Sequence, residues 1–76
     1  MSHKPTKEQL TESGKILRNL RGIRTRSGVA RAVGISYTAL YYYENGERNP
    51  NGRVKQKLAD YYGVKPQDIF LFLVNT

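Results

Sequence analysis

Residues 34–46 decide the fold of this 76-residue chain; they read Gly34-Ile35-Ser36-Tyr37-Thr38-Ala39-Leu40-Tyr41-Tyr42-Tyr43-Glu44-Asn45-Gly46. Gly34 predicts a left-handed turn, Ser36 a helix N-cap and Gly46 a stop, which leaves a helix over residues 37–45. A helix this short is marginal in water because nucleation is costly. Neighbouring elements must therefore hold one face of it, and the other face is free to be presented.

The two faces of this helix differ in chemistry. Leu40 and Tyr43 project inward at helical spacing, with Ala39 at the edge. Tyr41 and Tyr42 cannot both point inward beside Leu40, so at least one ring is exposed, which is typical of a binding surface. The outward positions are Tyr37, Thr38, Tyr41, Tyr42 and Asn45.

A longer helix is expected before this segment. The run Thr6-Lys7-Glu8-Gln9 fits a capping box, so a first helix starts near Lys7. Gly22 weakens or ends this helix. Its packing stripe is predicted to consist of Ile16, Leu17, Leu20 and Ile23.

Three further short helices complete an all-α fold with five helices around one core. Thr25 caps a helix over residues 26–33, Asn51 caps one over residues 52–62, and Pro66 opens the fifth. We expect residues 1–6 to be a flexible N-terminal arm and residues 7–76 to be a single domain with an apolar C-terminal helix or tail.

Basic residues dominate the first half of the chain. The formal net charge is +7, from 13 basic and 6 acidic residues. A merely soluble surface mixes both signs, yet residues 13–43 contain no acid. The pattern indicates a polyanionic partner. Its spread over several short elements favours nucleic acid over a membrane surface. The basic residues in this stretch are Lys15, Arg18, Arg21, Arg24, Arg26 and Arg31.

Several function classes are excluded by what the chain lacks. It has no cysteine and one histidine, His3, and Glu44, Glu47 and Asp60 show no metal-ligand grouping. We therefore expect no enzyme, no cofactor, no metal and no small-molecule ligand. The longest apolar run, residues 69–74, is far below the roughly 20 residues that span a bilayer. With no signal-peptide pattern either, a cytoplasmic location is expected.

A set of short motifs runs through the chain: Gly34-Ile35-Ser36, Tyr43-Glu44-Asn45-Gly46-Glu47-Arg48-Asn49-Pro50, Tyr62-Gly63-Val64 and Asp68-Ile69-Phe70. Together they resemble the Cro/phage-repressor-like helix-turn-helix family, also called the xenobiotic-response-element class, over about residues 14–70. The resemblance implies a lambda-repressor-like DNA-binding domain. Its second and third helices form the helix-turn-helix, and the third lies in the major groove.

The resemblance also implies roles for polar residues. In the family, the opening of the second helix and the loop after the third hold phosphates. The family's helix-three glutamate pairs with an arginine of the first helix, here Arg18 or Arg21, and we assign Arg21 to Glu44. One departure is that Thr25-Arg26 stands where members commonly have Thr-Gln. The expected phosphate-binding residues are Arg18, Thr25, Arg26, Ser36, Asn45 and Arg48.

The expected base-reading residues are Tyr37, Thr38, Tyr41 and Tyr42. None of them is a bidentate partner for guanine or adenine, although threonine or tyrosine packs on a thymine methyl group. We therefore predict a large phosphate contribution and moderate base specificity, with a preference for A·T-containing half-sites or for DNA shape.

The C-terminal run at residues 69–74 is more apolar than one side of a short helix requires. It forms either a core helix with a frayed tail or a homodimer seam made by Phe70, Phe72, Leu73 and Val74. Among the remaining aromatic residues, Tyr43, Tyr61 and Tyr62 follow apolar spacing and are expected to be core or half-buried.

The leading prediction is a sequence-specific double-stranded DNA-binding transcriptional regulator. It would be a Cro-like protein or small repressor from a phage or other mobile element, in a bacterial cell or phage-infected host. A homodimer and a partner regulator protein are both left open. The alternative is a protein-interaction module on the same fold, an antirepressor or antitoxin that acts by binding another regulator.

Overall fold

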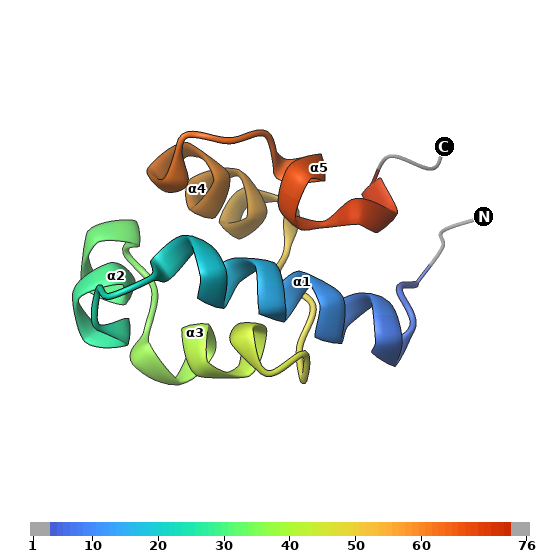
Figure 1. Ribbon diagram of the computed structural model, residues 1–76, viewed down its shortest axis with the longest axis horizontal. Helices are drawn as coiled ribbons and strands as arrows, with labels where there is room; N and C mark the ends of the chain where they lie inside the picture. The colour runs from blue at the N-terminus through green and yellow to red at the C-terminus, as the bar shows by residue number, and fades with distance from the viewer. Residues whose placement is uncertain (1–3, 74–76) are drawn as a thin grey trace.

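The helix α1 (Lys7–Arg21) runs through the middle of the molecule (Figure 1). The helix α3 (Tyr37–Glu44) lies along one side of it, and α4 (Gly52–Tyr62) and α5 (Pro66–Ile69) lie along the other. The helix α2 (Arg26–Val33) closes one end, and a short 3-10 helix, η1 (Leu71–Leu73), follows α5. This computed structural model describes residues 4–73, apart from the side chain of Leu73. The expected all-α, five-helix fold is confirmed.

The helices begin where their capping residues predict. In each of the first four, a side-chain oxygen accepts a hydrogen bond from the backbone N–H three residues further along, which satisfies a free helix N–H. Gln9 also reaches back to the Thr6 N–H and completes the capping box. The capping residues are Thr6, Thr25, Ser36 and Asn51.

One apolar core lies between α1 and the other helices. It takes residues from all five helices and from Phe70, which ends α5. Only Leu40 comes from α3, whereas α2 supplies three residues. The buried apolar residues are Leu17, Val29, Ala30, Val33, Leu40, Leu58, Ala59, Ile69 and Phe70.

The end of α1 lies at Gly22, as predicted, but the packing stripe stops earlier than expected. The helix stops at Arg21, and Gly22 turns the chain with a φ of 58°. Ile23 is fully exposed, so its assignment to the packing stripe was wrong: the helix ends before its side chain can turn inward. Nearby, the Arg24 guanidinium lies 5.6 Å from the ring centre of Tyr61. Tyr61 is 39% exposed, contrary to the expectation that it is core or half-buried.

The C-terminal run supports the core-helix alternative at Phe70. This ring is 1% exposed in the core, so its assignment to a homodimer seam was wrong. Phe72 is half-buried against the same core. The ammonium of Lys55 lies 4.8 Å from the Phe72 ring centre, and burial lowers the pKa of this lysine. The Leu73 side chain and Val74 lie outside the described residues.

Every helix within residues 4–73 is too short or too polar to cross a bilayer.

Candidate nucleic-acid interface

The outer surface of α3 presents the four expected base-reading side chains. Gly34 makes the left-handed turn before the helix, with a φ of 87°, and Ser36 caps it. Tyr37 and Tyr41 are 49% and 41% exposed. Thr38 is also exposed, and Tyr42 is half-buried. The helix ends at Glu44, one residue earlier than predicted, with Asn45 as its C-cap.

The inner surface of α3 is held against α1 by close backbone contact. A Cβ atom at Gly14 of α1 would collide with the Glu44 carbonyl oxygen. At the other end of the contact, Gly46 has a φ of 70°, and a Cβ there would lie 2.6 Å from the Thr11 Cα. Only glycine fits both places, so the C-terminal end of α3 lies directly on α1.

A buried carboxylate fixes α3 to α1 and α2. Glu44 is 1% exposed, and its Oε2 accepts a 2.8 Å hydrogen bond from Arg21 Nε. Its Oε1 accepts bonds from Arg21 Nη2 at 3.2 Å and from Arg26 Nε at 2.7 Å. Two cations thus offset the cost of removing one carboxylate from water. The cluster keeps one net positive charge.

Arg26 has a structural role in addition to the one expected of it. It was assigned to phosphate, but its Nε binds Glu44 and its Nη1 lies 3.4 Å from the Tyr37 hydroxyl. These hydrogen bonds, first to Glu44 and then to Tyr37, raise the pKa of the Arg26 guanidinium. Arg26 therefore links α2 to α3, with a quarter of its side chain still exposed. Its partner lies 18 residues away, and the signal available in the sequence was arginine in place of the family's usual glutamine.

Other expected phosphate ligands lie around the same surface. The hydroxyl oxygens of Thr25 and Ser36 accept their capping bonds, which leaves each O–H free to donate outward. Arg48 is exposed after α3, with its guanidinium 4.7 Å from the Tyr42 ring centre. Asn45 is half-buried at the end of α3. Arg18 is exposed on α1 and has no side-chain hydrogen bond or ion pair to any described residue.

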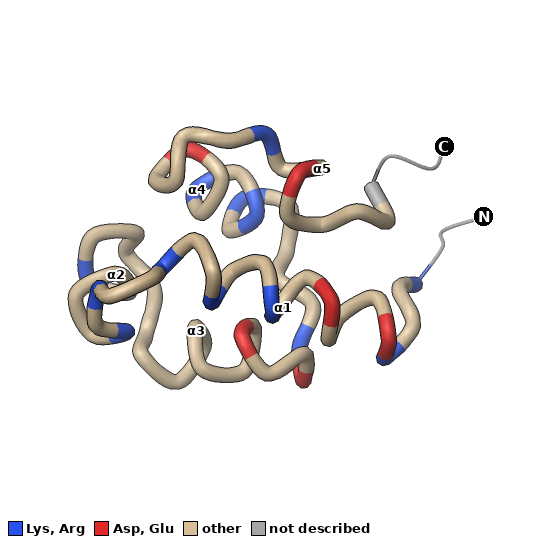
Figure 2. Tube along the Cα trace, in the orientation of Figure 1, with Lys and Arg blue, Asp and Glu red and all other residues tan. Residues whose placement is uncertain are grey.

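Charge is unevenly placed along the backbone. Figure 2 shows basic positions on α1, α2 and α4, whereas the acidic positions of α1 lie toward its N-terminal end. The single acid of α3 is the buried Glu44, which is neutralised from two sides. The charged side chains that α2 and α3 leave accessible, Arg26 and Arg31, are therefore both basic, although the exposed Glu47 follows α3. Basic side chains favour a polyanionic partner.

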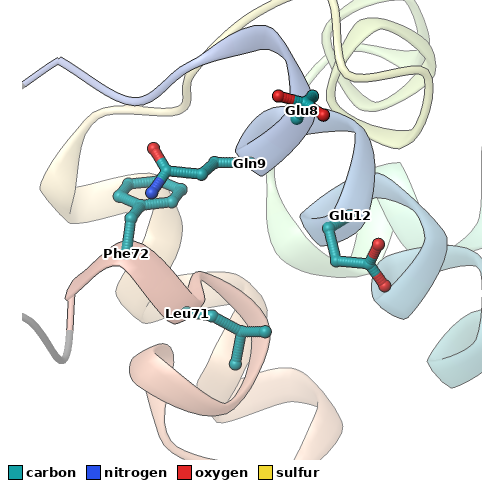
Figure 3. Close-up of a pocket in the computed structure, with 5 residues that line it drawn as sticks. All are labelled: Glu8, Gln9, Glu12, Leu71 and Phe72. Atoms are coloured by element: carbon teal, nitrogen blue, oxygen red, sulfur yellow. The ribbon is translucent and has the colours of Figure 1, made fainter.

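A hollow lies at the other end of α1, near its N-terminus. It has a volume of about 330 Å³ and is formed between the first turns of α1 and the 3-10 helix η1 (Figure 3). Exposed Leu71 and half-buried Phe72 form its apolar wall. The polar wall comes from Glu8, Gln9 and Glu12. The two carboxylates give this hollow an acidic wall in a basic protein.

Two short helices joined by a glycine turn, the second presented outward beside a positive surface, form the helix-turn-helix arrangement. The family model described as helix-turn-helix matches residues 15–69, so the chain belongs to this family. This match confirms the resemblance to the Cro-type members. The chain is also similar to an uncharacterized HTH-type transcriptional regulator of Methanocaldococcus jannaschii. The two are 31% identical over 48 residues, which cover 63% of this chain and 73% of that protein. No solved structure matches the chain.

Proposed function

We propose that this helix-turn-helix protein is a transcriptional regulator that binds a double-stranded DNA operator with α3 in the major groove. The observation that carries the proposal is the outer face of α3, where exposed Tyr37, Thr38 and Tyr41 stand beside arginines. Membership of the family and the similarity to an HTH-type transcriptional regulator support a DNA-binding regulator.

The dimensions and donors of this surface suit duplex DNA. An α-helix with its side chains is about 10–12 Å across, and the major groove of B-DNA is about 12 Å wide. With α3 in the groove, the first turn of α2 points its free N–H groups at the backbone. Phosphate oxygens would then accept from the hydroxyls of Thr25 and Ser36 and from Arg48, with Arg18, Asn45 and the exposed part of Arg26 on the same backbone.

Salt dependence tests the phosphate contribution. If about five basic residues each neutralise one phosphate, the slope of log affinity against log salt is about −4 to −5 per subunit. The measurement uses duplexes selected by the protein from a random pool, titrated at several salt concentrations. A slope near zero would remove duplex DNA as the partner.

A matched pair of variants tests the orientation of α3. The double variant Thr38→Ala with Tyr41→Ala is expected to lower affinity for the selected duplex by about tenfold or more, because both side chains leave the groove. The control is Tyr61→Ala, which removes an equally exposed tyrosine from α4 on the other side of α1 (Figure 1). Equal losses in both variants would contradict a groove-bound α3.

The finer role that we propose is a small, Cro-like repressor that binds a palindromic operator as a homodimer. Half-sites of such operators lie about one DNA turn apart, and a two-fold protein pair matches them. With Phe70 in the core, the described part of the seam is reduced to Phe72, next to exposed Leu71. Truncation after Leu71 tests the seam, and an unchanged mass in solution refutes it.

One observation favours the alternative, a module that binds another regulator protein. The hollow between α1 and η1 has an apolar wall with exposed Leu71 and contains no residue of α3. If the double variant in α3 keeps full operator binding and only a complex with a regulator protein is lost, this second function is the correct one.

A further inference from the structure

Two aromatic rings of α3, exposed Tyr41 and half-buried Tyr42, form a continuous row with two arginines. The Arg26 guanidinium lies 5.3 Å from the ring centre of Tyr41. Tyr41 meets Tyr42 edge-on, with 5.9 Å between the ring centres, and Arg48 lies 4.7 Å from the ring centre of Tyr42. We call these four residues the Arg–Tyr row.

The row holds its rings in place before any ligand arrives. Glu44 fixes Arg26 through a 2.7 Å bond, so the cation over Tyr41 is itself anchored in the core. A cation over a ring face within about 6 Å is attractive, and so is an edge-on ring pair. Less rotamer entropy is therefore lost when the rings meet a ligand, which favours selective contact.

This surface lacks the usual readers of purines. The helix α3 contains no Asn, Gln, Arg or Lys, the side chains that pair with two atoms of adenine or guanine. Arg26 is occupied by Glu44 and Tyr37, and Arg48 lies against Tyr42 beyond the helix. Asn45 follows the helix as its half-buried C-cap. Besides hydroxyl groups, ring edges and the Thr38 methyl group are what α3 offers to the groove floor.

Apolar contact in the major groove has one natural target, the methyl group on C5 of a pyrimidine. Thymine carries it. Chemically, 5-methylcytosine carries the same group at the same ring atom, whereas uracil and cytosine carry hydrogen there. A surface that recognises only this group cannot separate the two methylated bases.

We infer that the Arg–Tyr row and Thr38 read the C5-methyl groups of pyrimidines in duplex DNA, and that this protein therefore accepts 5-methylcytosine as a ligand in place of thymine. The inference rests on the proposed function, since it needs α3 in the major groove. Its consequence is that C5 methylation of cytosine strengthens or creates binding sites for this protein.

The test compares four pyrimidines at one position of the selected duplex. Thymine against uracil, and 5-methylcytosine against cytosine, each change only the methyl group while the pairing partner stays the same. Burial of one methyl group predicts about fourfold tighter binding for the methylated member of each pair. Ratios of one in both pairs at every position overturn the inference. A thymine preference with no 5-methylcytosine preference also overturns it.

Variants assign the effect to the row. Tyr41→Phe and Tyr42→Phe keep the rings and should keep both ratios, although any hydroxyl contact to phosphate is lost. The double variant Tyr41→Ala with Tyr42→Ala should lower both ratios toward one, because only the Thr38 methyl group is left to contact the base, with its helical content checked by circular dichroism. The control Tyr61→Ala should keep both ratios. If the double alanine variant is folded and keeps them, the row is not the reader and the inference fails.

The outcome is separable from that of the proposed function. Failure to bind any selected duplex with the expected salt slope refutes DNA binding itself. Salt-dependent binding that ignores both methyl pairs refutes only the reading of methyl groups.

Discussion

The helices α3 and α4 are held in the molecule by opposite means. The helix α4 lays Leu58 and Ala59 into the core and contacts α5, so apolar packing fixes it. The helix α3 buries one leucine, Leu40, and one glutamate, Glu44. Its remaining support comes from two arginines and from backbone contact at Gly14.

The difference teaches how a short helix can be both fixed and exposed. Apolar packing is non-directional, whereas a carboxylate that binds two guanidinium groups sets the rotation of the helix about its axis. The Glu44 cluster therefore orients α3 with its tyrosines outward, and no further part of the helix surface has to be buried in the core. Four substitutions test this contrast between apolar and charged support.

The largest loss of stability is expected from a change in the apolar core. Phe70→Ala removes a buried ring from the end of α5 and should lower the free energy of unfolding by about 3–5 kcal/mol. Urea unfolding followed by circular dichroism measures it. Because Phe70 packs in the core, a variant that still folds should keep the oligomeric state of the unaltered protein. A change of oligomeric state with no loss of stability would instead place Phe70 in a dimer seam.

The charged support of α3 is tested by Glu44→Gln, which keeps the shape of the side chain but leaves Arg21 and Arg26 without a counter-charge. We expect the free energy of unfolding to fall by about 2–4 kcal/mol, at the lower end because both arginines are partly exposed to water. Operator affinity should fall as well, since α3 loses its fixed rotation. The double variant with Arg26→Gln should recover part of the stability. No loss in the single variant would mean that the cluster contributes nothing.

The backbone contact is tested by Gly14→Ala. The added methyl group meets the Glu44 carbonyl, so α3 must move away from α1, at a cost of about 1–3 kcal/mol. Gly52→Ala is the matched control, because a Cβ there meets nothing within 4 Å. Equal unfolding curves for the two variants would contradict the close approach of α1 and α3.

The smallest effect is a pH dependence at Tyr62. Burial, and then the negative charge of Glu44, raises the pKa of Tyr62 to about 12 in the fold, against about 10 when unfolded. Its contribution is fully present below about pH 10 and is lost as the pH rises toward about 12. Tyr62→Phe should leave stability at pH 7 nearly unchanged, since the hydroxyl has no hydrogen-bond partner in the described residues. Between about pH 10 and 12 the free energy of unfolding of this variant should fall less steeply than that of the unaltered protein. An identical fall in both proteins contradicts a raised pKa at Tyr62.

Much of the fold was readable along the chain because local chemistry carries it. The caps at Thr6, Thr25, Ser36 and Asn51 fix helix starts through bonds that span three residues. Gly22 likewise signalled the end of α1. The position of Ile23 could not be predicted, because the spacing of apolar residues continues past Gly22 although the helix does not.

The candidate site divides in the same way. The outward face of α3 follows from helical spacing, and the partnership of Glu44 with Arg21 from the family resemblance. Arg26 could not be assigned, because its choice between a phosphate and Glu44 depends on where two helices come to rest. The need for glycine at position 14 could not be predicted either, because it comes from contact with the carbonyl group of Glu44, 30 residues further along the chain.

A five-helix, cation-rich helix-turn-helix protein with tyrosines on a short exposed helix could be predicted from the sequence alone. Those properties rest on caps, spacing and composition, which act over a few residues. Tertiary structure alone decided that Arg26 joins Glu44, that two arginines bracket the tyrosine rings, and that Phe70 belongs to the core. Burial and charge pairing between segments distant in the chain depend on packing, and packing exists only once the helices have met.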